Sequence, residues 1–321
     1  MAAERDTLTA LDRALERRQV LLDGEDVTAY RLLSGPFEGV PGVFVDRYGP
    51  AAALAVYEPQ QAPVEAIAAH LQERLGLRAV YLKRFVKDRS ALGGRFDEQL
   101  RDPAPLLGEA VPETLTIMEY GASFEARLYD GYSTGLFLEQ RENRRFLARE
   151  VAGQRVLNTF AYTCGFSVTC ARAGATVTSV DVSKRYLDWG KRNFELNGLA
   201  AAEHYFTAAD ALEFLRFAKK RELRFDLVIL DPPSFGAGKK GKSFSATRDY
   251  AELLQRAAAV LGPRGRLFAS TNNTTLARGE TLDQLIREAL GRGWRRLELP
   301  DAPLDFAMET GRLACRLLRR Q

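Results

Sequence analysis

The sequence predicts an α/β protein in which a smaller N-terminal α+β domain precedes a doubly wound, mostly parallel sheet. Three observations support this fold class. From Arg144 onward, short apolar runs alternate with helical segments, as in parallel strands joined by helical crossovers. Several of these runs end in a polar side chain, at the edge where such sheets bind ligands. The first third of the chain instead shows short apolar stretches broken by glycine and proline.

The N-terminal third begins with a predicted amphipathic helix from Leu8 to Leu22, because its leucines recur at helical spacing among charges. A strand-strand-helix-strand unit follows, with its elements at Val43 to Val45, Ala51 to Tyr57, Val64 to Leu75 and Ala79 to Phe85. We therefore expect an N-terminal helix in residues 1–24 and a small α+β domain in residues 25–112. A hairpin around Gly121 then leads into a large domain, residues 113–321.

The large domain is expected to hold five strands separated by helices, at Arg155 to Thr159, Thr176 to Asp181, Glu203 to Thr207, Asp226 to Leu230 and Gly265 to Ser270. Asp231 follows the fourth strand, and Pro232 and Pro233 then force the chain out of the sheet, because proline cannot donate to a sheet ladder. A carboxylate and the Phe235 ring on such a loop can hold a planar nitrogen heterocycle. A strand end with a simple proline turn is the alternative interpretation.

Composition narrows the class of protein. The 321 residues are 46% hydrophobic and 27% charged, which indicates a folded, soluble protein with a full core. No run of 18 apolar residues occurs, so we expect no membrane span and a cytoplasmic location. The three cysteines lack paired spacing, which argues against disulfides and against a metal site. The isoelectric point of about 8.9 suits a partner that carries phosphates.

A cofactor site is predicted where the first strand of the large domain turns into a helix. The turn contains only one glycine, Gly165, so the glycine-rich cradle that binds a dinucleotide's pyrophosphate is missing. The N–H groups of a helix N-terminus suit a cofactor that has a carboxylate and no phosphates. S-adenosylmethionine is such a molecule. The candidate ligands in this turn are Asn158, Phe160, Tyr162, Thr163, Cys164, Gly165, Phe166 and Ser167.

Acidic residues after the following strands extend this site. Asp181 ends the second strand 23 residues after Asn158 (181 minus 158), close to the offset of about 20 at which an acidic residue binds ribose hydroxyls. Asp210 lies where an adenine amino group would lie, and Asp231 completes the row. Each carboxylate could instead cap a helix, but several polar strand ends along one sheet edge favour a ligand site. The neighbouring candidates are Val182, Ser183 and Ala211.

The segment Gly131 to Arg144, GYSTGLFLEQRENR, resembles the TGxFLDQRxNR signature of the bacterial large-subunit ribosomal RNA methyltransferases of the RlmI and RlmK type. Further matches are Tyr30 to Leu33, Gly39 to Gly49, Val156 to Phe166, Ser179 to Asp181, Asn193 to Asn197 and the DPPSF loop that starts at Asp231. The resemblance spans about residues 30 to 318. It implies a Rossmann-like, S-adenosylmethionine-dependent enzyme acting on 23S ribosomal RNA or a ribosome assembly intermediate. It also implies cofactor-binding roles for Phe137, Gln140, Arg144 and Asn197.

The chain departs from this family's pattern in three places. Cys164 stands where the family usually has a glycine, and we expect no counterpart of the N-terminal PUA RNA-binding domain common in the family. Members that methylate carbon 5 of cytosine carry a nucleophilic cysteine after the fifth strand, whereas this chain reads Ala269 to Thr275 without a thiol. Direct transfer to a nitrogen is therefore expected, with guanine N7 favoured and an exocyclic amine possible, because a nitrogen lone pair needs only alignment with the methyl group. Cytosine C5 is the alternative.

The residues expected to act on the substrate are Asp231, Pro232, Phe235 and Asn272, since amide groups such as that of Asn272 can hydrogen-bond a base edge. Lys239, Lys240 and Lys242 follow the DPPSF loop and are expected to bind phosphates, with a solvated surface as the alternative. A methyltransferase of small molecules or proteins is a rival interpretation, as is an RNA-binding protein with a degenerate cofactor site. A homodimer is left open.

Overall fold

The computed structural model describes residues 2–85, 98, 100–236 and 244–321. By their contacts these residues form two compact units, Met1–Arg141 with Ala302–Glu309, and Glu142–Asp301 with Thr310–Gln321. The first unit therefore includes a segment from late in the chain. It also includes the hairpin that the sequence predicts as the entrance to the large domain. The domain boundaries after residues 24 and 112 stay predictions.

The first unit is built on a five-stranded sheet of order β1-β2-β3-β4-β5. Its strands are β1 (Ala29–Ser34), β2 (Val43–Tyr48), β3 (Ala51–Tyr57), β4 (Ala79–Phe85) and β5 (Leu107–Gly108). β3 and β4 are parallel and are connected through α3 (Val64–Leu75), while the other pairs are antiparallel. The sequence predicted β3, α3 and β4 at these bounds but missed β1 and β5. β1 is buried at nearly every position and so lacks an alternating pattern, and β5 has only two residues.

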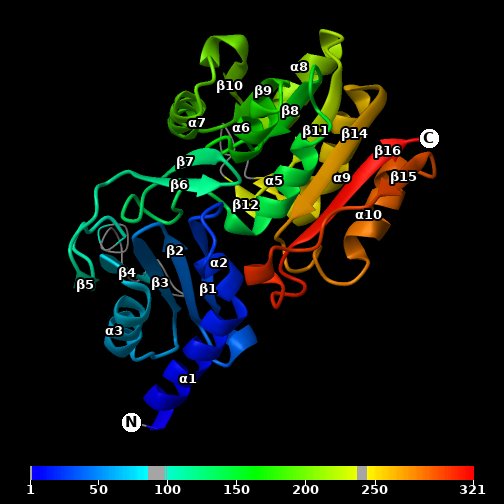
Figure 1. The fold of residues 1–321 in the computed structure, drawn as a ribbon. Helices are drawn as coiled ribbons and strands as arrows, with labels where there is room; N and C mark the ends of the chain where they lie inside the picture. Colours follow the sequence, from blue (N-terminus) through cyan, green and yellow to red (C-terminus); the bar gives the residue numbers. More distant parts are fainter. Residues whose placement is uncertain (1, 86–97, 99, 237–243) are drawn as a thin grey trace. The chain divides into compact units, whose positions relative to one another are not determined.

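Two helices, α1 (Ala2–Arg17) and α2 (Gln19–Leu22), replace the single helix expected from Leu8 to Leu22. The helix is interrupted at Arg18. The guanidinium of this residue is buried and donates to both carboxylate oxygens of Glu38 and to the carbonyl of Arg31. A buried charge needs this degree of pairing. The apolar side of α1 packs with α3 against one face of the sheet (Figure 1).

The opposite face of β4 is lined by the alternate side chains of Tyr81, Lys83 and Phe85. Each contacts the segment 129–132. The ring of Tyr81 lies 5.4 Å from that of Tyr129, Lys83 Nζ donates to the Gly131 carbonyl over 2.9 Å, and Phe85 packs on Tyr132. Lys83 is only 4% exposed. Burial lowers the pKa of its ammonium to about 8, although the charges of Asp46 and Asp130 oppose this shift.

Replacing Lys83 with methionine is expected to stabilise the protein at neutral pH. Because the folded-state pKa of about 8 lies below the ordinary 10.5, the unfolded chain binds more protons between these values, and unfolding of the wild type should cost more free energy as the pH rises from 8 to 10.5. The variant lacks this pH dependence. Its free energy of unfolding should therefore exceed that of the wild type by about 1–2 kcal/mol at pH 7, after loss of one hydrogen bond, and by less at pH 10.5. Urea titrations at pH 7 and pH 10.5 measure the free energy of unfolding of the wild type and the variant. An advantage that does not change with pH would contradict the assignment, and Lys184→Met, at a side chain 80% exposed, is the control.

The late segment 302–309 closes a buried network of charges in the first unit. Asp305, at the middle of the short helix η6 (Leu304–Phe306), is fully buried. Its Oδ1 accepts from Arg141 Nη2 over 2.5 Å and its Oδ2 accepts from the backbone N–H of Arg31 over 2.9 Å. Glu309 pairs with the Arg31 guanidinium. Arg31 of β1 also pairs with Asp46, but it and Arg141, which starts α5 (Arg141–Ala148), each pair with a carboxylate from a distant part of the sequence.

The hairpin of the first unit consists of β6 (Leu115–Glu119) and β7 (Ala122–Ala126). Its two turn residues, Tyr120 and Gly121, both have positive φ, 51° and 76°. This is the geometry of a two-residue type I′ turn, which matches the twist of paired strands. The hairpin predicted around Gly121 is confirmed.

The second unit is a seven-stranded sheet of order β10-β9-β8-β11-β14-β16-β15. The parallel strands are β8 (Arg155–Thr159), β9 (Thr176–Asp181), β10 (Tyr205–Ala208), β11 (Phe225–Leu230) and β14 (Leu261–Thr271). β16 (Ala314–Arg320) runs antiparallel to its neighbours β14 and β15 (Trp294–Leu297). The predicted doubly wound, mostly parallel sheet is confirmed. β14 starts earlier than expected, because Leu261 pairs with Phe225 ahead of a Gly-Pro step that masks the strand pattern.

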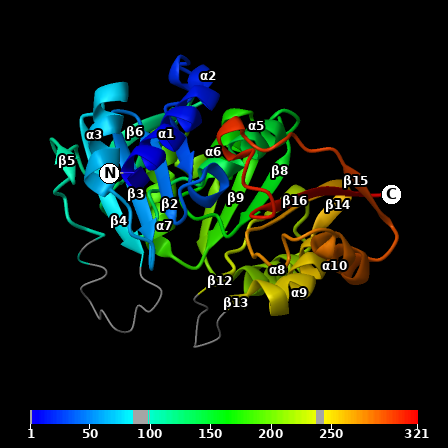
Figure 2. The same cartoon turned by 90° about the horizontal axis from the view of Figure 1, so that it is seen from below.

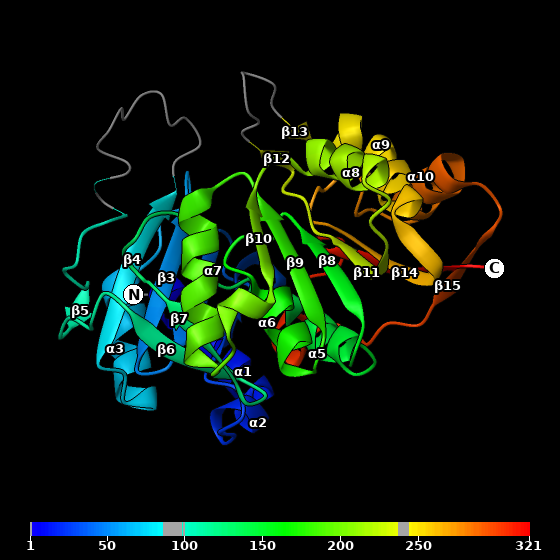
Figure 3. The same cartoon turned by 90° about the horizontal axis from the view of Figure 1, so that it is seen from above.

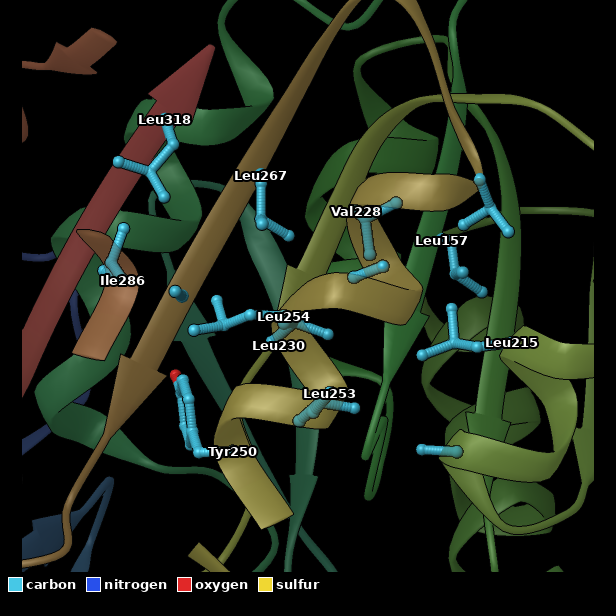
Figure 4. Close-up of a cluster of buried hydrophobic side chains, with 14 of the residues drawn as sticks. Leu157, Leu215, Val228, Leu230, Tyr250, Leu253, Leu254, Leu267, Ile286 and Leu318 are labelled. Atoms are coloured by element: carbon cyan, nitrogen blue, oxygen red, sulfur yellow. The ribbon is translucent and has the colours of Figure 1, made fainter. Parts of the chain in front are cut away.

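Helices cover both faces of this sheet (Figures 2 and 3). α6 (Gly165–Arg172) and α7 (Lys184–Leu196) lie on one face, and α8 (Ala211–Lys220), α9 (Ala246–Ala259) and α10 (Thr281–Leu290) lie on the other. Figure 4 shows the core under the second group, where Leu230 and Leu267 of the strands meet Leu254 of α9. In the part of the chain that the structure describes, no helix is both long and apolar enough to cross a membrane.

Candidate active site

The turn from β8 into α6 has an unusual backbone. Among the described residues other than glycine, five have positive φ, and three of them lie in this turn: Phe160 at 56°, Tyr162 at 49° and Cys164 at 67°. Side chains with a Cβ rarely adopt this conformation. It persists where the surrounding structure enforces it, which is common at ligand sites.

Asp181 holds this turn from the end of the neighbouring strand. Its Oδ2 accepts from the backbone N–H of Tyr162 over 2.9 Å, and its Oδ1 accepts from the N–H of Ser183 over 2.8 Å. Burial raises the pKa of the carboxyl, while the two backbone donors act in the opposite direction. Because each carboxylate oxygen has two acceptor lone pairs, Asp181 can hold the turn and still accept from ribose hydroxyls. Val182 beside it is 40% exposed.

A buried chain of hydrogen bonds lies beneath the turn. Asn158 Nδ2 donates to Ser167 Oγ over 2.9 Å, and Ser179 Oγ donates to the same oxygen over 2.8 Å. From α7, Asn193 Nδ2 donates to the carbonyl of Thr163 over 2.9 Å. These side chains orient the strand, the turn and the helix. The support given by Ser179 and Asn193 was not predicted, because a single buried polar residue leaves no periodic signal in a sequence.

Cys164 fits this turn by packing on a glycine of α7. The thiol is fully buried, and a Cβ placed on Gly190 would come within 2.3 Å of Cys164 Sγ. Burial raises the pKa of the thiol to about 12, so the side chain is neutral. The cysteine therefore acts here as a small packing residue.

Asp210 lies close to Asp181 at the same sheet edge, because β10 pairs with β9 as far as Ala208 and Asp181. It is the N-cap of α8, and its Oδ1 accepts from the backbone N–H of Glu213 over 3.0 Å. The helix cap considered as the alternative is thus present. It engages one oxygen of the carboxylate, so it is compatible with a contact from Oδ2 to an adenine amino group. Ala211 is the first residue of α8 and is buried.

Asn197 lies away from these groups. It caps the C-terminal end of α7, whereas the candidate Ser183 caps the N-terminal end. The 13 residues of the helix separate the two ends by about 20 Å along the helix axis. At that end of α7, Asn197 Nδ2 donates to the carbonyl of Asn193, and Asn197 Oδ1 accepts from Arg172. The structure does not bring Asn197 to the other candidate ligands.

The DPPSF loop and the end of β14 continue the same edge on the other side of β8. β11 pairs with both neighbours at Leu230, opposite Thr159 of β8 and Ala269 of β14, so Asp231 follows directly at the edge. Ser234 Oγ donates to Asn272 Oδ1 over 3.0 Å and ties the loop to the segment after β14.

The two asparagines after β14 have different surroundings. Asn272 is exposed. Asn273 is buried, and its Oδ1 accepts from the backbone N–H groups of Thr275 and Leu276. Asn273 therefore shapes the turn, and of the two side chains only that of Asn272 is exposed.

The remaining candidates fall into four groups. Phe160 and Tyr162 contact aromatic neighbours, Phe244 at 5.2 Å and Tyr186 at 4.6 Å between ring centroids, while the Arg144 guanidinium lies 5.9 Å from the centre of the Phe166 ring. Pro232 is buried, and Phe235 starts the short ribbon of β12 (Phe235–Gly236) and β13 (Phe244–Ser245). Phe137 and Gln140 belong to the first unit, where Gln140 is buried next to Arg141. Lys239, Lys240 and Lys242 lie outside the described residues.

The donor set at this edge fits S-adenosylmethionine. Carboxylates at the ends of β9 and β10 can accept from the ribose and the adenine amino group, and the N-terminus of α6 offers backbone N–H groups to a carboxylate. Residues 2–85, 98, 100–236 and 244–321 contain no group of three or more His, Cys, Asp or Glu side chains placed to hold a metal ion.

A seven-stranded sheet with acidic strand ends and an antiparallel strand beside β14 is the architecture of an S-adenosylmethionine-dependent methyltransferase. The model of a sequence family described as S-adenosylmethionine-dependent methyltransferase matches residues 99–316. A ribosomal RNA large subunit methyltransferase of Deinococcus radiodurans is 35% identical over 318 residues, or 92% of this chain and 75% of that protein. Ribosomal RNA large subunit methyltransferase I of Klebsiella pneumoniae is 35% identical over 264 residues, or 80% of this chain and 64% of that protein. The chain belongs to this methyltransferase family, of the RlmI and RlmK type, as its motifs predicted.

Solved structures agree with this assignment. A methyltransferase crystallised with S-adenosylhomocysteine, the product of the cofactor, superposes with a TM-score of 0.85 at 28% identity, covering 97% of this chain and 80% of the other. The protein is an S-adenosylmethionine-dependent methyltransferase.

Proposed function

We propose that the protein methylates a base of large-subunit ribosomal RNA by direct transfer to a nitrogen, with guanine N7 the favoured atom. The RNA substrate is proposed because the similar proteins of Deinococcus and Klebsiella are named for it. The substrate would be met in the cytoplasm, as 23S ribosomal RNA or an assembly intermediate. A homodimer stays a prediction. The observation that carries the choice of atom is the chemical state of the thiols.

The three cysteines are unsuited to nucleophilic attack on a pyrimidine. Burial raises the pKa of Cys164, Cys170 and Cys315 to about 12 in each case. Each is therefore a neutral thiol at physiological pH, whereas addition to a cytosine ring requires a thiolate. Cys315 on β16 is also held in hydrogen-bond contacts with Ser270 and Asn143. This chemistry supports transfer to an atom that already carries a lone pair.

The residues at the edge would orient a guanine without taking a proton from it. The Asp231 carboxylate can accept from the N1–H and amino groups of the base, and the Asn272 amide can donate to its O6. Pro232 and Pro233 stiffen the loop that carries the carboxylate. S-adenosylmethionine supplies an electrophilic methyl group when bound. Alignment of N7 with that group is then the main contribution of the protein.

Comparing modified nucleosides of large-subunit ribosomal RNA from wild-type and deletion cells by mass spectrometry tests this proposal. We expect the deletion to lose 7-methylguanosine, and expression of Cys315→Ser to restore it as well as the wild type does. Loss of 5-methylcytidine instead would overturn the assignment to nitrogen. An unchanged set of nucleosides would favour a small-molecule or protein substrate.

A further inference from the structure

Three arginines lie side by side across the last three strands of the sheet in the second unit. Arg319 of β16 is directly opposite Arg266 of β14 on one side and directly opposite Arg295 of β15 on the other. Opposite residues of antiparallel strands share one face of the sheet. This face points away from the core of Figure 4, because the adjacent residues Leu267 and Leu318 point into that core. We refer to Arg266, Arg295 and Arg319 as the arginine row.

The members of the arginine row differ in their surroundings. Arg266 is buried, and its Nη2 donates to the carbonyl of Glu150 over 2.9 Å and to the side chain of Gln154 over 3.1 Å. Its Nη1 lies 3.4 Å from the Glu150 carboxylate, which is 81% exposed. Arg295 and Arg319 are exposed, and neither guanidinium forms an ion pair with a carboxylate of the described residues. The row therefore has one fixed, partly compensated charge and two charges that are open to a ligand.

The arginine row opposes folding when no anion is bound to it, because like charges directly opposite each other on neighbouring strands repel. Burial lowers the pKa of the Arg266 guanidinium, the Glu150 carboxylate opposes this shift, and the charge of Arg319 adds to it. Charged residues on an edge strand prevent pairing with other sheets, which would account for Arg295. Arg319 lies on the inner strand β16, where no such protection is needed.

The chemistry of the row favours phosphate groups. A guanidinium is planar and permanently charged, and it can donate two parallel hydrogen bonds to a phosphate. Neighbouring strands lie about 4.8 Å apart, so Arg295 and Arg319 can meet the same phosphate or adjacent phosphates of one strand. Asn272 follows Arg266 by six residues (272 minus 266), which is about 20 Å along an extended strand. An RNA that reaches both ends of β14 must therefore extend well beyond the modified nucleotide.

We propose that Arg295 and Arg319 bind the sugar-phosphate backbone of the ribosomal RNA, at the end of the sheet opposite the row of acidic residues. The inference rests on the proposed function, because it requires the substrate to be RNA. Contacts to phosphates position a nucleic acid without reading its bases. The arginine row should thus contribute to affinity for a large RNA and leave the chemical step unchanged.

Filter binding of 23S ribosomal RNA purified from deletion cells, at salt concentrations from about 50 to about 200 mM, tests this inference. Arg295→Gln and Arg319→Gln should each reduce the slope of log affinity against log salt concentration by about 0.7–0.9, because each removes one phosphate contact. At about 50 mM salt this loss corresponds to about tenfold weaker binding. Arg216→Gln removes an exposed arginine of α8 and is the matched control, which should change neither the slope nor the affinity.

Thermal unfolding without RNA gives a second measurement, because Arg319→Gln also removes the repulsion within the row. We expect this variant to melt about 1 °C higher than the wild type while binding RNA less tightly. A structural role of Arg319 would instead lower its melting temperature. A lower melting temperature with unchanged RNA binding would overturn the inference.

The outcomes separate this inference from the proposed function. If the wild type does not bind 23S ribosomal RNA, the proposed substrate is wrong and the inference falls with it. If the wild type binds and Arg295→Gln, Arg319→Gln and Arg216→Gln all behave alike, the arginine row is not a contact, and the proposed function stands. Single-turnover methylation at saturating RNA should proceed at the wild-type rate in both row variants. A slower chemical step would contradict a role in affinity alone.

Discussion

Replacing Asp181 with alanine is expected to weaken the binding of S-adenosylmethionine at least about 100-fold. The carboxylate would accept from two ribose hydroxyls, and hydrogen bonds to a charged group contribute about 1.5–3 kcal/mol each. The same substitution removes the acceptor that holds the N–H groups of Tyr162 and Ser183. The turn from β8 into α6, with its three positive φ values, should therefore also lose order. Isothermal titration calorimetry measures the affinity.

Two further variants separate the direct contact of Asp181 from its structural role. Asp181→Asn keeps one acceptor oxygen and a similar volume, so we expect an intermediate loss of about tenfold. Asp188→Ala removes another acidic residue of the same unit, one that pairs on the surface with Lys184 and Lys191, and should leave the affinity unchanged. Unaltered binding by Asp181→Ala would remove Asp181 from the cofactor site.

Replacing Asp231 with alanine is expected to lower the rate of RNA methylation about 1,000-fold while changing the affinity for S-adenosylmethionine less than threefold. The proposed carboxylate contact orients the base, and loss of orientation or of one precisely placed polar group commonly costs about 100- to 1,000-fold in rate. Single-turnover transfer from labelled S-adenosylmethionine to ribosomal RNA from deletion cells measures the chemical step apart from product release.

Asp226 provides the matched control for this experiment. It is an aspartate of the same strand, β11, where its Oδ2 accepts from the backbone N–H of Arg155. Asp226→Ala should methylate at the wild-type rate once its folding has been confirmed. A normal rate with Asp231→Ala would instead identify Asp231 as a strand end without a role in the reaction.

The row of acidic residues could be predicted from the sequence because it depends on local patterns alone. Asp231 follows an apolar run directly and Asp181 follows the mixed stretch Thr176 to Val180, and parallel strands place such positions at one edge. Asp210 shows that the two interpretations weighed for each carboxylate are compatible, because it caps α8 and still lies at this edge. Local rules therefore predicted that these carboxylates lie along one sheet edge, without resolving the role of each.

The supporting residues could not be predicted, because their partners are distant in the sequence. Asn193 lies 30 positions from the Thr163 carbonyl to which it donates. Asp305 lies 274 positions from Arg31. Nothing in the neighbourhood of either residue marks it as a hydrogen-bonding partner, and β1, whose Arg31 N–H donates to Asp305, was itself missed. The cofactor-binding role of Asn197 was expected from the family match alone, and the structure places this residue at the C-terminal end of α7.

The position of Asp305 has a consequence for how the chain is made. Ribosomes release the N-terminal portion first, yet Arg18, Arg31 and Arg141 can donate their hydrogen bonds to Asp305 only after more than 300 residues have been synthesised. Glu38 and Asp46 can already pair with Arg18 and Arg31 in the nascent first unit, but the Asp305 carboxylate that pairs with the buried Arg141 guanidinium is still to be made. The first unit should thus complete its folding late, and an expression fragment ending after Arg141 would carry an unfinished interior.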